Sequence, residues 1–311
     1  MGKKRSWFHG NKQARKAETL STEYAKEKKR RTYRNSFLVE EVYETSRLQG
    51  VIVLGTIHGK IREGDTMYLY QPDEPVREVH VLALEAGPRE MLESAKNGRV
   101  GICIDVEKEE EVQRFAVLSS VKPVDETVPN RIVENPRLLG LMMEYARLYT
   151  NKIYMDVLLY ELCETKFLIP LYMGCPPMLQ EDGTFGYGKD APVGFRSLKD
   201  LEDPEKTVFP AFTDQFALSA WKDAFSKGQP RQVVAFFLPG IIHYVEKGHT
   251  GLVVNPFGPG TVKFPTELLK FVQNTEVYKR KFANVTASNG NPYLNVEKNV
   301  STEEKTEPAE E

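Results

Sequence analysis

Four glycines at short intervals divide one apolar stretch of this chain and constrain its fold more than any other feature. They are Gly50, Gly55, Gly59 and Gly64, set in a run rich in valine and isoleucine. Glycine permits positive φ and close backbone approach, which a tightly turned sheet needs at its corners. The pair Gly64-Asp65 is a turn signal directly before the alternating run 66–70. This pattern predicts a small, strongly curved antiparallel sheet.

Six short β-rich runs follow residue 35, separated by turn residues. Their spacing of about ten to fifteen residues is typical of a small barrel. We therefore predict a six-stranded antiparallel β-barrel over residues 36–122. The expected strands cover residues 37–43, 50–58, 66–70, 76–84, 100–106 and 112–121.

The glycine-bearing run carries a family resemblance. Residues 50–65, GVIVLGTIHGKIREGD, resemble the second domain of translational GTPases such as elongation factor Tu. Residues 95–102, AKNGRVGI, match the next signature of that family, a small residue and a glycine before a strand. The resemblance implies a barrel fold and a link to RNA or ribosomes. It implies no nucleotide hydrolysis, because a GTPase domain precedes the barrel in that family and a basic segment precedes it here.

Helical and strand patterns alternate from residue 134 to residue 282, which predicts an α/β domain with a mixed sheet. Asn135 as N-cap and Pro136 at the first helical position open the first helix. We thus expect an α+β multidomain fold, a small barrel followed by an α/β domain. The further expected helices are 152–163, 214–225, 241–247 and 266–273, and the strands are 167–172, 207–212, 233–237 and 251–255.

Four motifs in the second half resemble the SseB N-terminal domain family when taken together. In chain order they are NPRL at 135–138, FLIP at 167–170, FPAFTD at 209–214 and VVNPF at 253–257. The resemblance covers about residues 134–275 and implies an α/β fold. No catalytic residues are established for that family, so it implies none here.

Charge is distributed very unevenly along the chain, although the formal net charge is only −2. Residues 1–35 hold twelve Lys and Arg against three Glu, a net of +9, which leaves about −11 for residues 36–311. The last eighteen residues hold six Glu against two Lys. We expect a mobile basic arm (1–35), the barrel (36–122), a linker (123–133), the SseB-like domain (134–282) and an acidic disordered tail (283–311).

The basic arm is the candidate contact for RNA or another polyanion. Trp7, Phe8 and His9 lie among its charges and are able to stack on unpaired bases. A solubilising tail is an equally good interpretation. The candidate contacts are Lys3, Lys4, Arg5, Arg15, Lys16, Lys26, Lys28, Lys29, Arg30, Arg31 and Arg34.

One segment, GTFGYGKD at 183–190, fits the phosphate-binding pattern G-x-x-x-x-G-K up to its last letter. Asp190 stands where a hydroxyl should bind Mg²⁺, and residues 191–194 will not propagate the helix that receives the phosphate. We therefore expect no nucleotide as partner or cofactor, and a glycine-rich surface loop in this segment.

No other site chemistry emerges from the sequence. Cys163 and Cys175 are separated by eleven residues, whereas paired zinc ligands are usually two to four apart, so a site with His243 and His249 is disfavoured. Three cysteines without a secretory leader predict reduced thiols in a cytoplasmic protein. No apolar run approaches the roughly 20 residues of a membrane span. We expect no catalytic residue, no metal, no cofactor and no membrane partner.

The turn Asn255-Pro256-Phe257 has two interpretations: a binding rim at a strand end, or a hairpin corner between two strands. The function that these observations favour is a non-catalytic interaction or adaptor protein, with a protein or RNA and ribosomes as partner. The alternative is an enzyme whose active site is assembled from dispersed residues.

Overall fold

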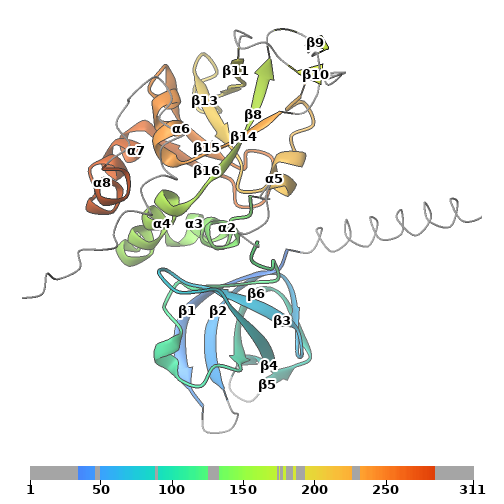
Figure 1. The fold of residues 1–311 in the computed structure, drawn as a ribbon. Coiled ribbons are helices and arrows are strands. Elements are labelled where there is room, and N and C mark those ends of the chain that lie inside the picture. The colour runs from blue at the N-terminus through green and yellow to red at the C-terminus, as the bar shows by residue number, and fades with distance from the viewer. Residues whose placement is uncertain are drawn as a thin grey trace, which may run out of the picture. The chain divides into compact units, whose positions relative to one another are not determined.

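The computed structural model describes residues 34–45, 50–87, 90–124, 133–173, 175, 178–179, 185–186, 193–225 and 232–283 (Figure 1). The chain divides into two compact units. The first contains residues up to 69 together with 76–114 and 118–122, and the second contains 70–75, 115–117 and the chain from 123 onward.

Six strands close the barrel of the first unit, as expected from the sequence. Their order around the barrel is β3-β7-β1-β2-β6-β4, and β4 pairs again with β3 (Figure 1). A short strand, β5 (Glu90–Leu92), extends the sheet beside β4. The barrel strands are β1 (Ser36–Glu44), β2 (Val51–Arg62), β3 (Thr66–Tyr70), β4 (Arg77–Gly87), β6 (Ser94–Ile104) and β7 (Val117–Ser119).

The glycine pattern has a direct structural cause in β2. Alternate side chains of this strand, including Val53, Ile57 and Ile61, fill the barrel and are at most 1% exposed. A Cβ on Gly55 would lie 1.8 Å from the carbonyl oxygen of Leu38 on β1, so only glycine permits this approach. Gly59 adopts φ +102°, where β2 changes register.

Two barrel predictions were wrong in extent. Residues 112–121 do not form one strand: a 3-10 turn covers Glu109–Glu111, Phe115 has φ +63°, and β7 is only three residues long. β6 begins at Ser94 rather than near residue 100. Asn97 and Gly98 both have positive φ and lie at a register shift between β6 and β2. Their residue types are typical of a turn, so the sequence pattern predicted a turn here instead of a continuous strand.

The second unit contains a mixed four-stranded sheet in the order β12-β13-β15-β16. β13 and β15 are parallel, and the two outer pairs are antiparallel. Its strands are β12 (Leu198–Lys199), β13 (Thr207–Ala211), β15 (His249–Val254) and β16 (Val262–Pro265). The α+β class with a mixed sheet is therefore confirmed.

A three-stranded antiparallel sheet, β11-β8-β14, adjoins this one through a bridge between Leu168 and Phe212. Its strands are β11 (Val193–Phe195), β8 (Phe167–Met173) and β14 (Val233–Phe236), and a small pair joins β9 (Met178–Leu179) to β10 (Phe185–Gly186). The helices are α2 (Pro136–Met143), α3 (Tyr145–Leu148), α4 (Lys152–Glu164), α5 (Gln215–Ser219), α6 (Leu238–Val245), α7 (Thr266–Gln273) and α8 (Glu276–Phe282).

Helices α6 and α7 cover one face of the four-stranded sheet. Phe209, Leu252 and Phe264 point to that face and are at most 1% exposed. Tyr244 of α6 stacks on Phe209 with ring centroids 5.8 Å apart. Because side chains alternate along a strand, Val208 and Val253 point to the opposite face.

The helix predicted over 214–225 was too long. α5 ends at Ser219, and the chain then continues in turns. Trp221 and Ala224 are nevertheless buried with Phe212 in one apolar cluster, so their spacing reflects burial rather than helix. The predicted helix at 241–247 begins earlier, at Leu238, with a proline in its first turn. The sequence interpretation missed β9, β10, β11, β12, β16 and α8.

Candidate functional site

A buried polar network joins three segments that are distant in sequence. Asn255, at the end of β15, is 0% exposed and has φ +51°. Its Oδ1 accepts a hydrogen bond from the backbone N–H of Thr213 at 3.0 Å. Asn135 Nδ2 donates to the carbonyl oxygens of Thr213 at 2.6 Å and Lys166 at 2.8 Å. Three of the four motifs that the sequence analysis quoted from the second half of the chain therefore contribute to this network.

This arrangement corrects the expected role of Asn135. It occupies the N-cap position of α2, but its side chain makes no capping bond and instead joins the ends of β8 and β13. A side-chain cap is found instead on another helix, α5, where Asp214 Oδ1 accepts a hydrogen bond from the Ala217 N–H at 2.8 Å. Thr213 Oγ1 donates to the other oxygen of Asp214 at 2.8 Å.

The Asn255 turn connects β15 to β16, which pair antiparallel. Within it, the carbonyl oxygen of Asn255 accepts from Gly258 N–H at 3.0 Å and from Thr261 Oγ1 at 2.6 Å. Phe257 packs on Trp221, with ring centroids 5.6 Å apart, yet remains 49% exposed. The turn therefore presents a rigidly supported aromatic ring.

A cavity of about 440 Å³ lies beside this turn, and we call it the sheet groove. Its floor lies on the sheet face opposite α6 and α7, where Val208 and Val253 point. One wall is the turn and the other is the loop after β12. The apolar residues lining it are Leu198, Leu201, Val208, Val253, Pro256 and Phe257.

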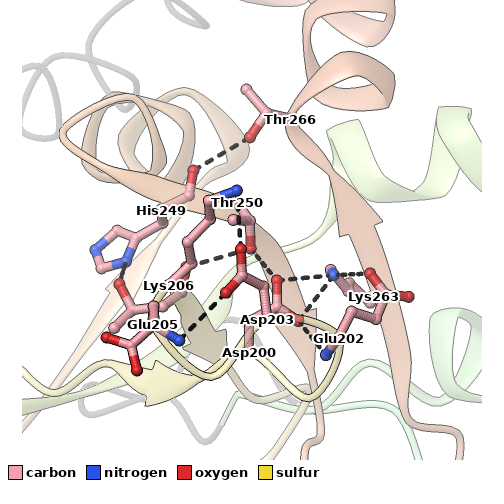
Figure 2. Close-up of polar contacts among 10 residues, drawn as sticks. Asp200, Glu202, Asp203, Glu205, Lys206, His249, Thr250, Lys263 and Thr266 are labelled. Carbon is pink, nitrogen blue, oxygen red and sulfur yellow. Dashed lines mark hydrogen bonds and ion pairs between the residues drawn. The ribbon is translucent and has the colours of Figure 1, made fainter.

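An ion cluster fixes the loop wall (Figure 2). Asp200 is 3% exposed, and its carboxylate accepts hydrogen bonds from Thr250 Oγ1 and from Lys263 Nζ, the latter at 2.9 and 3.0 Å. The same ammonium contacts Glu202 at 2.5 Å. The Asp200 N–H donates to the carbonyl of Lys206 at 3.0 Å, which closes the loop. Leu201, held between these anchors, is 99% exposed.

Hydrogen bonds hold Asp200 and Lys263 in their charged forms. The hydrogen bond from Thr250, followed by those from Lys263, lowers the pKa of Asp200 from 3.8 to about 2. Burial lowers the pKa of Lys263, but hydrogen bonds to Glu202 and Asp200 outweigh it and leave the pKa above 10.5. General acid–base catalysis works best with a pKa near the operating pH. Neither group meets this condition.

His249 lies on the helix-covered side of the ion cluster (Figure 2). Its Nδ1 is 2.9 Å from Thr207 Oγ1, and its ring lies 5.6 Å from that of Phe209. Burial lowers its pKa below 6.5, so the imidazole is neutral at pH 7. The described part of the chain contains no group of three His, Cys, Asp or Glu side chains suited to a metal ion.

The structure places few of the residues that the sequence singled out. Apart from Arg34, the candidate polyanion contacts of the basic arm lie outside the described residues, and so does most of the segment 183–190. Cys163 is buried, and burial raises the pKa of its thiol to about 11. No helix of the described ranges has the length and apolarity needed to cross a membrane.

Sequence reasoning missed Asp200, Leu201 and Lys263. The segment 198–206, LKDLEDPEK, reads as a solvated charged loop, and nothing in its spacing pairs it with Lys263 more than fifty residues later. The one sequence signal for this site was Leu201, an apolar residue between the carboxylates of Asp200 and Glu202. Asn255, Pro256 and Phe257 were singled out correctly as one turn, although their binding role stays a prediction.

No family model matches the sequence, and no curated protein matches it either. The structure is similar to that of GDP-bound aIF5B from Aeropyrum pernix, with 16% sequence identity and a TM-score of 0.24. The similar part covers 29% of this chain and 17% of that chain, so this chain spans about a sixth of it. Such a likeness carries no argument about function.

Proposed function

We propose that this chain is a non-catalytic interaction protein whose sheet groove binds an extended segment of a partner protein. The observation that supports this is the groove itself. It is a cavity of about 440 Å³ above an apolar sheet face, and hydrogen bonds or packing hold both of its walls in place. Its volume falls in the range of roughly 300–1,000 Å³ that is typical of ligand sites. An extended peptide places every second side chain on such a face.

The chemistry of the walls specifies the segment. Phe257 and Leu201 offer exposed apolar surface, which suits aromatic or long aliphatic anchors. The loop wall, residues 198–206, carries four carboxylates and two lysines. A partner segment with an apolar anchor beside basic residues complements both features.

The enzyme alternative fits the groove less well. Its buried carboxylate and its lysine satisfy each other, and neither has a pKa near neutrality. A catalytic acid or base works best when its pKa lies near the working pH. An ion pair of this kind stabilises a wall instead.

A selection from displayed random peptides on the full chain tests the proposal. We expect the enriched sequences to combine apolar anchors with Lys or Arg. Leu201→Asp places a charge at the groove and should weaken binding of an enriched peptide at least about tenfold, or ~1.4 kcal/mol.

Ile153→Asp is the matched control for that selection. Ile153 is another exposed aliphatic residue of the same unit, at 56%, and does not line the groove. Equal affinity of the parent and both variants for the enriched peptide would overturn the proposed function.

RNA association through residues 1–35 is the second candidate, favoured by the net +9 of that segment. Counterion release makes log affinity fall by about 0.7 per neutralised phosphate for each tenfold rise in salt on single strands. If half of the twelve basic residues engage, fourfold more salt should weaken binding by roughly 2–3 orders of magnitude. Replacing Lys28, Lys29, Arg30 and Arg31 by glutamine should reduce this slope, and an unchanged slope would assign RNA binding elsewhere.

A further inference from the structure

A second cavity, of about 350 Å³, lies in the second unit and shares no lining residue with the sheet groove. All of its lining residues belong to that unit. Helices α2 and α4, which pack on each other, contribute Arg137 and Tyr160 to it, so we call it the helix cavity. Its volume falls in the range of roughly 300–1,000 Å³ that is typical of ligand sites.

The buried guanidinium of Arg137 has hydrogen-bond donors that the fold leaves unused. Its side chain is 7% exposed, and Nη1 donates to Glu161 Oε2 at 2.6 Å. Nε and Nη2 have no hydrogen-bond partner among the described residues. Buried donors without a partner are uncommon, and they are costly when they carry charge. Because Arg137 lines the helix cavity, a ligand bound there would bring the missing acceptors.

The geometry of an arginine specifies what kind of acceptor this is. The N–H groups of Nε and Nη2 lie on one edge of the planar guanidinium and point the same way, so they match two oxygens of a single acidic group. The ring of Tyr160 covers one face of the Arg137 guanidinium, with 5.9 Å between Cζ and the ring centroid. The donors that remain at Arg137 therefore select a carboxylate or a phosphate, which accept two bonds side by side.

The charge of the cavity favours a carboxylate on a ligand that also carries a positive group. Acidic residues outnumber basic ones in its lining by five to one. Glu161 pairs with Arg137, and Glu164 pairs with a lysine of α8. Glu74 is exposed and makes no hydrogen bond or ion pair with any residue that the structure describes. Such a lining repels a phosphate dianion and attracts an ammonium group.

Asn135 provides a neutral acceptor at the same cavity. Its Nδ2 donates to the carbonyl oxygens of Lys166 and Thr213, which fixes the orientation of the amide. Its Oδ1 accepts no hydrogen bond within the described ranges and is not buried, so it is open to solvent. An ammonium group has three N–H donors and no acceptor, which suits this oxygen.

We propose that the helix cavity binds a small zwitterion with one carboxylate and one ammonium group, the chemistry of a free amino acid. The carboxylate accepts from Nε and Nη2 of Arg137, and the ammonium donates to Asn135 Oδ1 beside Glu74. This site is separate from the sheet groove and does not depend on the proposed function. A ligand that supplies the missing acceptors binds the folded chain alone and therefore stabilises it.

Isothermal titration calorimetry of the full chain with each standard amino acid tests this site. The tightest binder is then compared with its amide, which lacks the carboxylate, and with its N-acetyl form, which lacks the ammonium. We expect each analogue to bind at least about tenfold more weakly, because each loses charge-assisted hydrogen bonds. The proposal is wrong if no amino acid binds, or if either analogue binds as tightly as the amino acid itself.

Three variants separate the site from effects on folding. The double variant Arg137→Met with Glu161→Leu removes the buried pair as a unit, which is often neutral for stability, and should abolish binding. Arg137→Lys keeps a cation beside Glu161 but lacks the paired edge donors, and should weaken binding at least about tenfold.

Ile153→Asp is the matched control, because Ile153 lies on α4 and is exposed but does not line the helix cavity. It should leave the affinity unchanged, and thermal unfolding verifies that every variant is folded. Binding that survives in both Arg137 variants overturns the proposal, and so does an equal loss in Ile153→Asp. Neither result bears on the sheet groove, which the peptide selection tests independently.

Discussion

Two carboxylates of the second unit have little solvent-exposed surface, yet their pKa values move in opposite directions. Asp200, in the loop of the sheet groove, is 3% exposed, and its pKa falls. Glu161, on α4, is 9% exposed, and its pKa rises because burial outweighs the Arg137 guanidinium beside it. Asp200 receives bonds from Thr250, Lys263 and a backbone N–H.

Glu161 has a poorer set of partners. Its Oε2 lies 2.6 Å from Arg137 Nη1, but Nε and Nη2 of that arginine have no hydrogen-bond partner among the described residues. Burial is the largest cause at Glu161, whereas hydrogen bonds outweigh it at Asp200, so the balance between desolvation and the number of donors decides whether a carboxylate stays charged. The Asp200 cluster is thus fully hydrogen-bonded, whereas the Arg137–Glu161 pair between α2 and α4 leaves two buried guanidinium nitrogens without a partner among the described residues.

Removing one partner of the ion pair between Arg137 of α2 and Glu161 of α4 should have the largest effect on stability. Glu161→Ala leaves the Arg137 guanidinium buried without a counter-ion and should lower the free energy of unfolding by ~3–5 kcal/mol. Urea denaturation followed by circular dichroism measures it. The double variant Arg137→Met with Glu161→Leu should be near neutral or more stable. A double variant as unstable as the single one would show that the pair is needed as such.

The pH dependence of stability should have opposite signs at the two sites. The folded-state pKa of Asp200 lies below its unfolded value, so its contribution is complete above pH 3.8 and is lost as pH falls toward about 2. Asp200→Asn should therefore flatten that acid limb. The pKa of Glu161 is raised above 4.5, so its contribution is present at low pH and is lost as pH rises.

Glu161→Gln should accordingly remove a decline above pH 4.5 and leave the acid limb unchanged. Thermal unfolding of the parent and both variants across pH 2–7 checks the pair of signs. Parallel shifts in the two variants would contradict the opposite pKa directions.

The smallest effect on stability should come from Leu201, the residue to which the proposed function assigns a contact with the partner segment. Leu201→Asp changes a fully exposed side chain, and such substitutions are usually within about 0.5 kcal/mol. Urea unfolding should therefore leave its midpoint near that of the parent, while peptide binding is lost. A large loss of stability would mean that Leu201 packs within the fold rather than serving as a contact.

The sequence predicted the barrel well and the sheet groove hardly at all, for a physical reason. Strands such as β2 carry their own period-two signal, and Gly55 records a close approach to the next strand. The groove is built from three separate segments, and the Asp200–Lys263 pair becomes visible only after the strands are paired. The Asn255 turn was found because its proline and asparagine restrict the backbone locally.

Two prolines protect the asparagines of the buried polar network from deamidation. Deamidation of an asparagine begins when the backbone nitrogen of the next residue attacks the side-chain amide, and proline lacks the N–H that this step must lose. Asn135 and Asn255 are each followed by proline, whereas the exposed Asn97 is followed by Gly98. Long storage should therefore convert the two asparagines that precede a glycine, Asn97 and Asn289, before the two amides that hold β8, β13 and β15 together.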